Sequence, residues 1–404
     1  MIAARAAMPF FCKTEVSDSD LDALVADVAR DSKKRHHRQR QRNKPMNVVL
    51  MLIGLTSLGL ATTPVGAAQP TSASPDCRSE GDLSFVCGPK KPEDLAVLPG
   101  TDWLIASGME EGGGLHLIDT RTKMWRRWIA ARPVKSDPRF PDCDSPPDPE
   151  RFSAHGLALR AAAKGTARLF VVGHGEREAV EVFDITMSGP QPHLSWRGCV
   201  RAPGELAFNS VAAAPDGTLL ATVLLLPGKT FADAFAGKST GAVFEWRPGD
   251  HAFRQVEGTS LPADNGIEIS PDGKTVYVAA TPVQAVTAFA RGKTWRKLWT
   301  VTTPDTSPDN LHWAPNGMLY AAGMAENEPA CGGPVKVVNG RLSLFDCPRG
   351  YRVAAIDPNT AEVHIVARGA AVADYSGTAT ALPAGGNLWL SSLSGNRLAY
   401  RPWP

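Results

Sequence analysis

From residue 93 onward, the chain repeats one arrangement of apolar and polar positions. A short apolar stretch enters a Pro, Asp, Asn or Gly turn, a second apolar stretch leaves it, and a weaker hairpin follows after a gap. Short apolar runs separated by such turns predict β-hairpins. The clearest copies are NSVAAAPDGTLLATVLL (209–225), NGIEISPDGKTVYVAA (265–280) and DNLHWAPNGMLYAAG (309–323), and weaker copies are EDLAVLPGTDWLIASG (93–108), HGLALRAAAKGTARLFVVG (155–173) and GTATALPAGGNLWLSSL (377–393).

The spacing of these copies predicts the fold class. Successive copies start 62, 54, 56, 44 and 68 residues apart, which leaves room for four short strands in each. No stretch of this region has a long helical period, and second hairpins are visible at 114–129, 179–185, 242–256, 285–299 and 351–367. Six repeats of four strands predict an all-β, six-bladed β-propeller around a central channel. A pair of β-sandwiches is the alternative, but the regular repetition argues against it.

The ends of the repeat region indicate how the ring closes. The last copy finishes with NRLAYRPWP (396–404), which leaves its blade one strand short. The segment DLSFVCG (82–88) precedes the first copy and has the pattern of a strand. We expect it to supply the missing outer strand of the last blade.

The first strand of each propeller blade lines the channel, so the residue at its start lies near the axis. Asn265-Gly266 is such a start, and we interpret Gly266 as the residue that lets the backbone pass close by. Five of the six copies carry strong polar groups at this position, namely Glu93-Asp94, His155, Asn209-Ser210, Asn265 and Asp309-Asn310, whereas the sixth has Ser376-Gly377. Apolar residues follow each of them, so these groups are not part of a general polar surface.

Carboxylates and carboxamides at this position of successive repeats predict a metal site. Glu93, Asp309, Asn209, Asn265 and Asn310 offer hard oxygen ligands, which suit Ca²⁺. Mg²⁺ or Mn²⁺ are alternatives, whereas Zn²⁺ prefers more nitrogen or sulfur. Turn capping would explain any one of these residues, but it does not require the same phase in each blade.

Two histidines are candidates for proton transfer beside that metal. His155 shares the phase of the metal ligands, and His174 in VVGHG ends the next strand of the same blade. We interpret His155 as a general base or proton shuttle and His174 as its partner. The sequence contains no phosphate-binding glycine loop. The histidines interpreted as structural are His116, His193, His251, His312 and His364.

Composition and charge are those of a globular protein without a basic binding face. Of the 404 residues, 43% are hydrophobic and 21% charged, and the net charge is +2. A nucleic-acid-binding face normally unbalances that total, so no nucleic-acid partner is expected.

The first residues differ from the rest and predict export. A basic run at 33–44 precedes an apolar stretch at 48–60, and Ala67 and Ala68 follow. This order is typical of a secretory signal, and the apolar stretch is short for a membrane span. We therefore divide the chain into a basic flank with signal peptide (1–68) and one propeller domain (69–404), in the periplasm or secreted. An uncleaved signal anchor and a start at Met46 remain alternatives.

The cysteines agree with an oxidising compartment. Outside the predicted signal region six remain, an even number that suggests disulfides. Proximity along the chain suggests Cys77–Cys87 and Cys331–Cys347, which leaves Cys143–Cys199, although the sequence alone does not fix the pairing.

Seven short motifs follow one another through the six predicted blades, two of them in the second. They are PEDLAVLPG (92–100), AHGLAL (154–159), LFVVGH (169–174), FNSVA (208–212), NGIEISPDGKTVYVA (265–279), PDNLHWAPNG (308–317) and GTATAL (377–382). This ordered set resembles the paraoxonase/arylesterase family within the gluconolactonase-like, calcium-dependent six-bladed propellers. The resemblance covers about residues 77–404.

The resemblance implies roles for individual residues. Positions matching Glu93, Asn209, Asn265, Asp309 and Asn310 hold the catalytic calcium in that family, and those matching His155 and His174 form a dyad implicated in lactone and ester hydrolysis. A second calcium is held there partly by the residues matching Asp94 and the Leu157 carbonyl, and by an aspartate. Ser210 stands in place of that aspartate, so a neutral hydroxyl replaces a charge and a lower affinity for a second ion is expected.

We therefore expect a carboxylic-ester hydrolase, a monomer that acts on a small lactone or ester. The alternatives are a sugar lactonase of the gluconolactonase type and a non-catalytic, calcium-stabilised binding module. The inserts 132–152 and 324–350 are expected to overhang the channel end, and the apolar stretch 223–237 favours an apolar substrate wall.

Overall fold

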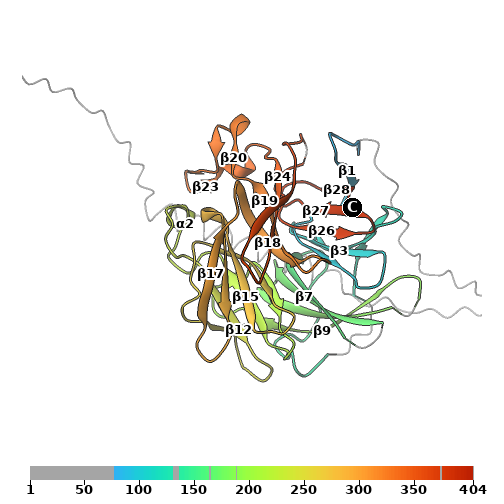
Figure 1. Ribbon diagram of the computed structural model, residues 1–404. Helices are drawn as coiled ribbons and strands as arrows, with labels where there is room; N and C mark the ends of the chain where they lie inside the picture. The colour runs from blue at the N-terminus through green and yellow to red at the C-terminus, as the bar shows by residue number, and fades with distance from the viewer. Residues whose placement is uncertain (1–76, 131–135, 163–164, 188, 374, 404) are drawn as a thin grey trace, which may run out of the picture. The chain divides into compact units, whose positions relative to one another are not determined.

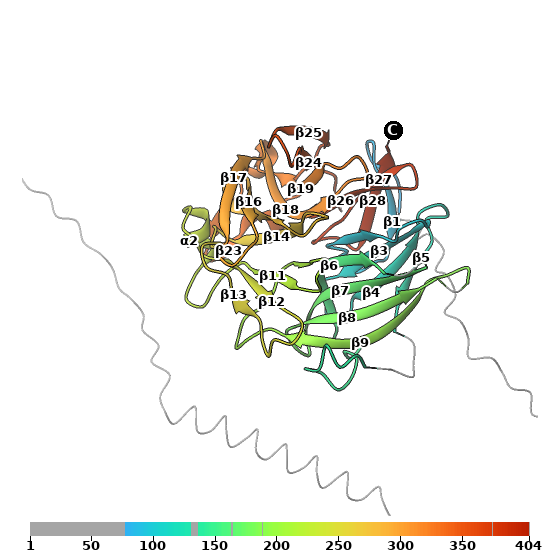
Figure 2. The same cartoon turned by 60° about the horizontal axis from the view of Figure 1, so that its bottom comes forward.

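The computed structural model describes residues 77–130, 136–162, 165–187, 189–373 and 375–403. They belong to one compact unit, Gly66–Pro404, and form six four-stranded antiparallel sheets. The sheets are arranged as the blades of a six-bladed β-propeller, which confirms the predicted fold class. In Figure 2, β6, β14, β18 and β26 lie toward the centre of the ring, whereas β9, β17 and β25 lie outside. The predicted boundary near residue 68 lies outside the described residues.

The first three blades each run in chain order from the channel outward. Blade one contains β2 (Leu95–Val97), β3 (Trp103–Gly108), β4 (Gly114–Asp119) and β5 (Trp125–Trp128). Blade two contains β6 (Ser153–Ala161), β7 (Thr166–His174), β8 (Ala179–Thr186) and β9 (His193–Arg201). Blade three contains β10 (Val211–Ala213), β11 (Leu219–Val223), β12 (Ala242–Trp246) and β13 (Arg254–Gln255).

The other three blades complete the ring (Figure 1). Blade four contains β14 (Asp264–Ile269), β15 (Thr275–Ala280), β16 (Ala285–Ala290) and β17 (Arg296–Thr302). Blade five contains β18 (Thr306–Trp313), β19 (Leu319–Ala325), β24 (Tyr351–Ile356) and β25 (Val363–Arg368). Blade six contains β26 (Ala381–Ala384), β27 (Asn387–Leu390), β28 (Arg397–Pro402) and β1 (Ser84–Cys87).

The ring closes through β1, as the sequence predicts. Ser84 pairs with Tyr400 and Cys87 with Arg397 in an antiparallel ladder. A strand from the start of the described chain thereby completes the blade formed by its end, and β28 is paired on both sides.

Apolar side chains fill each of the six interfaces between neighbouring blades. In β7, Leu169 and Val171 pack toward blade one, whereas Phe170 and Val172 pack toward blade three. Successive side chains of a strand point to opposite faces of its sheet. Because both faces of β7 are buried here, residues 169–172 form a continuous apolar run rather than an alternating one.

Helical structure is limited in the described residues to short segments near one end of the channel. They are α2 (Phe231–Phe235) and the 3₁₀ turns η1 (Thr281–Val283), η2 (Pro329–Cys331) and η3 (Ser343–Phe345). The insert between β19 and β24 also forms the small hairpins β20 (Asn327–Glu328) with β21 (Gly333–Pro334), and β22 (Val337–Val338) with β23 (Arg341–Leu342). None of the helices described here is long and apolar enough to cross a membrane.

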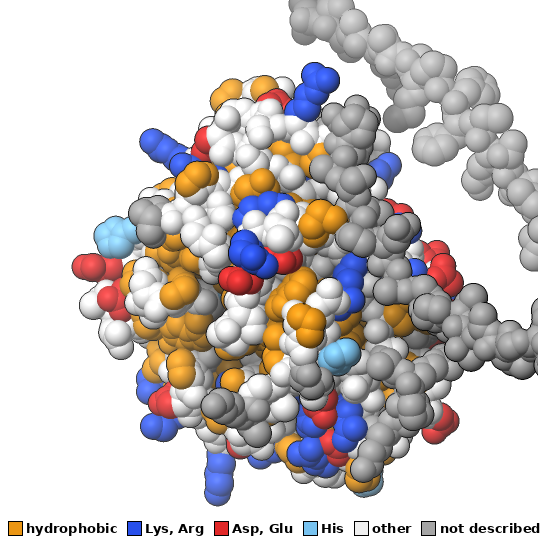
Figure 3. Space-filling model, turned by 90° about the vertical axis from the view of Figure 1, so that its right-hand side faces the viewer, with side chains coloured by type: hydrophobic (Ala, Val, Ile, Leu, Met, Phe, Trp, Pro, Cys, Tyr) orange, Lys and Arg blue, Asp and Glu red, His pale blue; other side chains and the backbone are white. Residues whose placement is uncertain are grey.

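All three expected disulfides are present. They join Cys77 to Cys87, Cys143 to Cys199 and Cys331 to Cys347. On the face shown in Figure 3, basic and acidic side chains are interspersed among apolar and polar ones. That face has no region of a single charge, in keeping with the balanced composition.

Candidate metal centre

The inner strands of blades two, four and five share a local distortion near their starts. The pairing register shifts between Ala154 and Leu157 in β6, between Asp264 and Ile267 in β14, and between Pro308 and Leu311 in β18. A bulge re-aims side chains and is common beside functional sites. In each blade it contains the polar residues expected at the axis, which are His155, Asn265 and Asp309-Asn310.

The two glycines in these bulges let neighbouring blades approach at the site. A Cβ on Gly266 would lie 2.2 Å from the carbonyl oxygen of Asp309, and one on Gly156 would lie 2.6 Å from the Cα of Ser210. Each glycine therefore faces the polar pair of the next blade, where a side chain would clash with backbone. This confirms the interpretation that Gly266 leaves room for the backbone.

The structure brings the predicted ligands to one place. Glu93, Asn209, Asn265, Asp309 and the candidate base His155 line a single cavity of about 470 Å³. Asn310 joins them because its Nδ2 donates a hydrogen bond to Glu93 Oε1 at 2.6 Å. Residues from blades one, three, four and five thus converge at the channel end where the inner strands begin.

Two buried acceptors of this ring lack a hydrogen-bond partner. Glu93 Oε2 and Asn310 Oδ1 are buried without a hydrogen bond, although such groups are normally satisfied. Asn209 and Asn265 are hydrogen-bonded to each other, and Asn265 Nδ2 also donates to Thr281 Oγ1. Among the described residues, no Lys or Arg forms an ion pair with Glu93 or Asp309.

The pKa shifts of the two carboxylates also indicate a site for a cation. Burial raises the pKa of Glu93 well above its usual value, and the nearby carboxylates of Asp309 and Asp94 raise it further. Burial also raises the pKa of Asp309 to about 7, with Asp94 adding to the effect. Two buried carboxylates without a cation from the chain, surrounded by carboxamides, fit a hard divalent cation with oxygen ligands.

The two candidate histidines are in contact beside this ring. His155 Nδ1 lies 3.1 Å from His174 Nε2, and His155 Nε2 lies 3.7 Å from Glu93 Oε2. Burial, together with the adjacent His174, lowers the pKa of His155 to about 3. His155 is therefore a neutral imidazole at the cavity wall.

The contacts also include Glu178, which we did not expect from the sequence. The other ring nitrogen of His174, Nδ1, lies 2.6 Å from Glu178 Oε2. Glu178 follows β7 by one short turn and directly precedes β8. Its position four residues after His174 in a tight hairpin was the only available signal.

Asp94 lies next to Glu93 in sequence but has a different environment. Its carboxylate accepts hydrogen bonds from the Leu157 amide at 2.7 Å and the Thr380 hydroxyl at 2.7 Å, and His312 Nε2 lies 2.6 Å away. Burial alone would raise the pKa of Asp94, but His312 and these hydrogen bonds lower it. Ser210 is buried, and its amide donates to Thr222 Oγ1. A second ion at Asp94 and Leu157 stays a prediction.

His312, interpreted from sequence as structural, therefore lies in the channel. Its Nδ1 is 3.8 Å from Glu268 Oε2, and both residues line a cavity of about 420 Å³ where the inner strands end. Burial raises the pKa of Glu268 to about 7. The signal was present in the sequence, since residues two apart in a strand share a face and His312 is two positions after Asn310.

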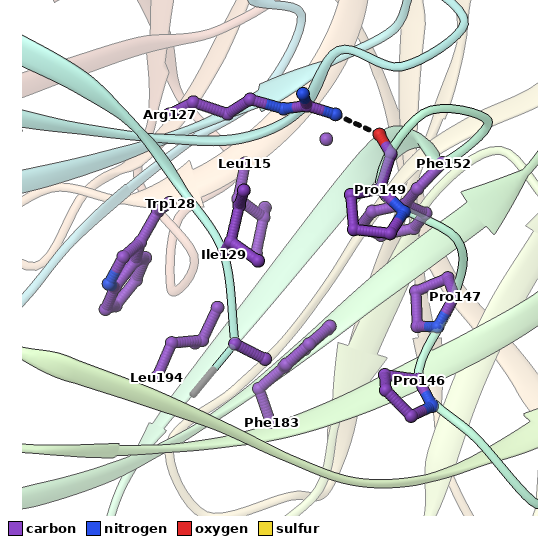
Figure 4. A pocket seen from close by; sticks show the side chains of 12 residues that line it. Leu115, Arg127, Trp128, Ile129, Pro146, Pro147, Pro149, Phe152, Phe183 and Leu194 are labelled. Carbon is purple, nitrogen blue, oxygen red and sulfur yellow. Dashed lines mark hydrogen bonds between the residues drawn. The ribbon is translucent and has the colours of Figure 1, made fainter. Parts of the chain in front are cut away.

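The predicted overhang at 132–152 is wrong for its described part. Cys143 is bonded to Cys199 in β9, and Pro141 forms a bridge to the same residue. These contacts hold the insert against the outermost strand of blade two. Pro146, Pro147 and Pro149 instead line a small apolar pocket in which Arg127 donates to the Pro149 carbonyl (Figure 4).

The other two sequence expectations about the cavity wall are confirmed. Leu224, Phe231 and Phe235 come from the apolar stretch 223–237 and line the 470 Å³ cavity. The insert 324–350 contributes Met324, Val335, Gly340, Arg341, Leu342 and Leu344. Thr230 caps α2 through a reciprocal hydrogen-bond pair with Asp233, which fixes the helix at the cavity edge.

Comparison with known proteins relates the middle of the chain to one family. Residues 153–342 match the family described as the SMP-30/Gluconolactonase/LRE-like region. This segment includes every predicted metal ligand of blades three to five and both histidines, but not Glu93. No curated protein sequence matches the chain.

Solved structures of similar arrangement have low sequence identity. A luciferin-regenerating enzyme is 14% identical, with 79% of this chain and 94% of that chain covered at a TM-score of 0.48. A putative gluconolactonase is 14% identical, with 80% and 92% covered and a TM-score of 0.46. Regucalcin from Agrobacterium tumefaciens, described as a calcium-binding protein, is 12% identical, with 78% and 90% covered and a TM-score of 0.46.

Proposed function

We propose that this protein is a calcium-dependent hydrolase of lactones and esters, of the paraoxonase/arylesterase type. One observation carries the proposal. Two buried carboxylates that lack a cation, Glu93 and Asp309, share a cavity with a neutral His155 that is hydrogen-bonded to His174. The match of residues 153–342 to a gluconolactonase-like region supports the same class of chemistry.

The ion would be held by Glu93, Asn209, Asn265, Asp309 and Asn310. When bound, it would polarise the substrate carbonyl and stabilise the negative charge that develops on its oxygen. The chain supplies the base: His155 Nε2 faces the cavity and can take a proton from a water molecule as that water attacks the carbonyl carbon. His174 holds the opposite ring nitrogen of His155.

The cavity wall favours a lipophilic substrate over a sugar lactone. The polar groups are concentrated where the inner strands begin, and the remaining lining includes Met109, Leu224, Phe231, Phe235, Pro282, Met324, Val335, Leu342, Leu344 and Leu393. The hydroxyl groups of a sugar would lose hydrogen bonds to water against such a wall. An alkyl or aryl group would gain from being buried there.

The test is hydrolysis of a panel of aliphatic lactones, aryl esters and sugar lactones, with and without EDTA and added Ca²⁺. We expect calcium-dependent turnover that is fastest on aliphatic lactones or aryl esters. Asp309→Ala should lower kcat/KM by ~10³-fold, while Asp102→Ala, in an exposed turn, should leave it unchanged. Full activity of Asp309→Ala would overturn the proposal, and preference for sugar lactones would favour the gluconolactonase alternative.

A non-catalytic binding module is distinguished by the histidine. Such a module needs no imidazole beside the ion, so His155→Gln would leave its binding intact. A hydrolase should instead lose ~10²-fold or more in kcat while keeping its calcium affinity.

The setting we propose is the periplasm or the exterior of the cell, as a monomer. Three disulfides are typical of proteins that fold in an oxidising compartment. Residues 1–68 would act as a basic flank and signal peptide, with membrane attachment only if the signal is not cleaved. The mass of the mature protein tests this, since removal of residues 1–68 leaves a chain starting at Gln69.

A further inference from the structure

We propose that Glu178 is a positioning residue, the third member of a Glu178–His174–His155 hydrogen-bond chain that fixes the unprotonated Nε2 of His155 toward the cavity. The expected effect of Glu178 on catalysis rests on the proposed function, whereas the hydrogen-bond chain itself does not. Neither the sequence pattern nor the family resemblance pointed to this carboxylate.

The chain of contacts determines which nitrogens carry protons. A carboxylate only accepts, so the 2.6 Å contact between Glu178 Oε2 and His174 Nδ1 requires a proton on that nitrogen. In neutral His174 the proton on Nδ1 leaves Nε2 as an acceptor. The 3.1 Å contact between His174 Nε2 and His155 Nδ1 then requires a proton on His155 Nδ1.

The consequence appears at the far end of the chain. A neutral His155 with its proton on Nδ1 has a lone pair on Nε2, the nitrogen on the side of Glu93 Oε2, 3.7 Å away. That is the protonation state a general base needs. The opposite tautomer would place a proton on Nε2 and leave no acceptor for a water proton.

The other charged side chains of this hairpin have partners elsewhere. Glu176 accepts a hydrogen bond from the Asp148 amide, and Arg177 binds Glu181 and the Ser145 carbonyl. Glu178 has no side-chain partner other than His174 among the interactions of the described residues. An exposed ion pair would contribute little to stability, whereas a bond to this nitrogen controls the tautomer of two imidazoles.

Local backbone geometry produces the contact. His174 is the last residue of β7, Glu178 directly precedes β8, and Gly173 pairs with Ala179 across the hairpin. Gly175 has a φ of +96°, and a Cβ there would lie 2.2 Å from the Arg151 carbonyl oxygen. The turn therefore closes tightly enough to return the chain beside the imidazole.

The first experiment reads the tautomers directly. In ¹⁵N-labelled, calcium-loaded protein, long-range ¹H–¹⁵N spectra distinguish a protonated Nδ1 from a protonated Nε2, with His174→Gln and His155→Gln used to assign signals. In the wild type we expect Nδ1 to be protonated in both rings. In Glu178→Leu we expect a mixture of rings protonated at Nδ1 and at Nε2. A protonated Nε2 on His174 in the wild type would overturn the proposal.

The second experiment measures turnover on the best lactone or ester. Glu178→Leu removes the acceptor and should lower kcat by ~10- to 100-fold with KM nearly unchanged, less than the ~10⁴-fold loss when a buried triad aspartate is changed to asparagine. Glu178→Gln can turn its amide NH₂ toward His174 Nδ1, which favours the opposite tautomer, so it should lose at least as much kcat as Glu178→Leu. Glu176→Gln, in the same loop, is the matched control and should behave as wild type.

The outcomes separate this proposal from the proposed function. Equal kcat for wild type and Glu178→Leu, or wild-type kcat in Glu178→Gln, would overturn the positioning role, since the carboxylate acceptor would not be what matters. A wild type without hydrolase activity would overturn the proposed function, while the tautomer measurement would still decide the hydrogen-bond chain.

Discussion

Glu93 and Asp94 are consecutive residues with opposite surroundings. Glu93 faces the cavity with an unpartnered buried oxygen and two carboxylates nearby, so its pKa is raised. Asp94 faces the channel interior, where His312 and donors from blades two and six lower its pKa. The chain neutralises one carboxylate with its own groups, whereas the other is a proposed ligand of a cation. Burial alone therefore does not distinguish these two carboxylates; the partners that the chain provides do.

The largest expected effect is on the Glu93 side. Glu93→Gln removes one ligand charge, and we expect kcat/KM to fall by ~10³-fold with a matching loss of calcium affinity. The stability of the calcium-free protein should not fall, because the repulsion with Asp309 is removed. Activity assays, calcium titration calorimetry and urea unfolding in EDTA check these three results. If Glu93→Gln bound calcium with the affinity of the wild type, Glu93 would not differ from Asp94 in serving as a calcium ligand.

On the Asp94 side, the expected loss is one of stability. His312→Leu leaves the Asp94 carboxylate buried without its cationic partner, which should cost about 3–5 kcal/mol in the free energy of unfolding, with or without calcium. His364→Leu, on the exposed edge strand β25, is the matched control and should change stability by less than about 0.5 kcal/mol. Equal stability of the two variants would show that Asp94 does not depend on His312.

Calcium removal should affect only one of the two sites. At 100 times its dissociation constant, one ion should stabilise the folded protein by about 2.7 kcal/mol, measured as a rise in Tm over the EDTA-treated protein. Calorimetry should give one ion per chain, because both oxygens of Asp94 already have partners. Two ions of similar affinity would place a cation beside Asp94 as well.

The smallest effect concerns Glu268, the carboxylate beyond His312. Burial raises its pKa from the ordinary glutamate value of 4.5 to about 7. The folded protein therefore holds a proton that the unfolded chain releases, and this contribution to stability falls as pH rises from about 4.5 to 7. Glu268→Gln should be more stable than wild type at pH 8 and show no gain at pH 4. A gain that does not depend on pH would contradict this assignment.

Much of the fold could be predicted because it depends on local periodicity. Apolar runs and Asp-Gly or Asn-Gly turns such as Asp272-Gly273 place the hairpins, and the short last repeat requires a strand from 82–88. The insert 132–152 was misplaced because a proline-rich segment has no strand pattern, and its position depends on the disulfide to Cys199.

The candidate site was predictable to the extent that it depends on the position of a residue within its repeat. Equivalent positions in successive repeats place Glu93, Asn209, Asn265 and Asp309 at one end of the channel. Position within the repeat could not predict the contact between Glu178 and His174, because that contact depends on the backbone conformation at Gly175. It also could not show that Asp94 is satisfied internally, since its partners come from three other blades.

The pairing of β1 with β28 has a consequence for biosynthesis. A ribosome produces Glu93 long before the strand Arg397–Pro402 that closes the circle, and Asn310 is anchored to the Ala379 carbonyl of the last blade. A growing chain thus lacks a finished ring until translation is nearly over. Loading of the proposed ion would then be a late event in maturation, and in an exported protein it would draw on the calcium outside the cytoplasm.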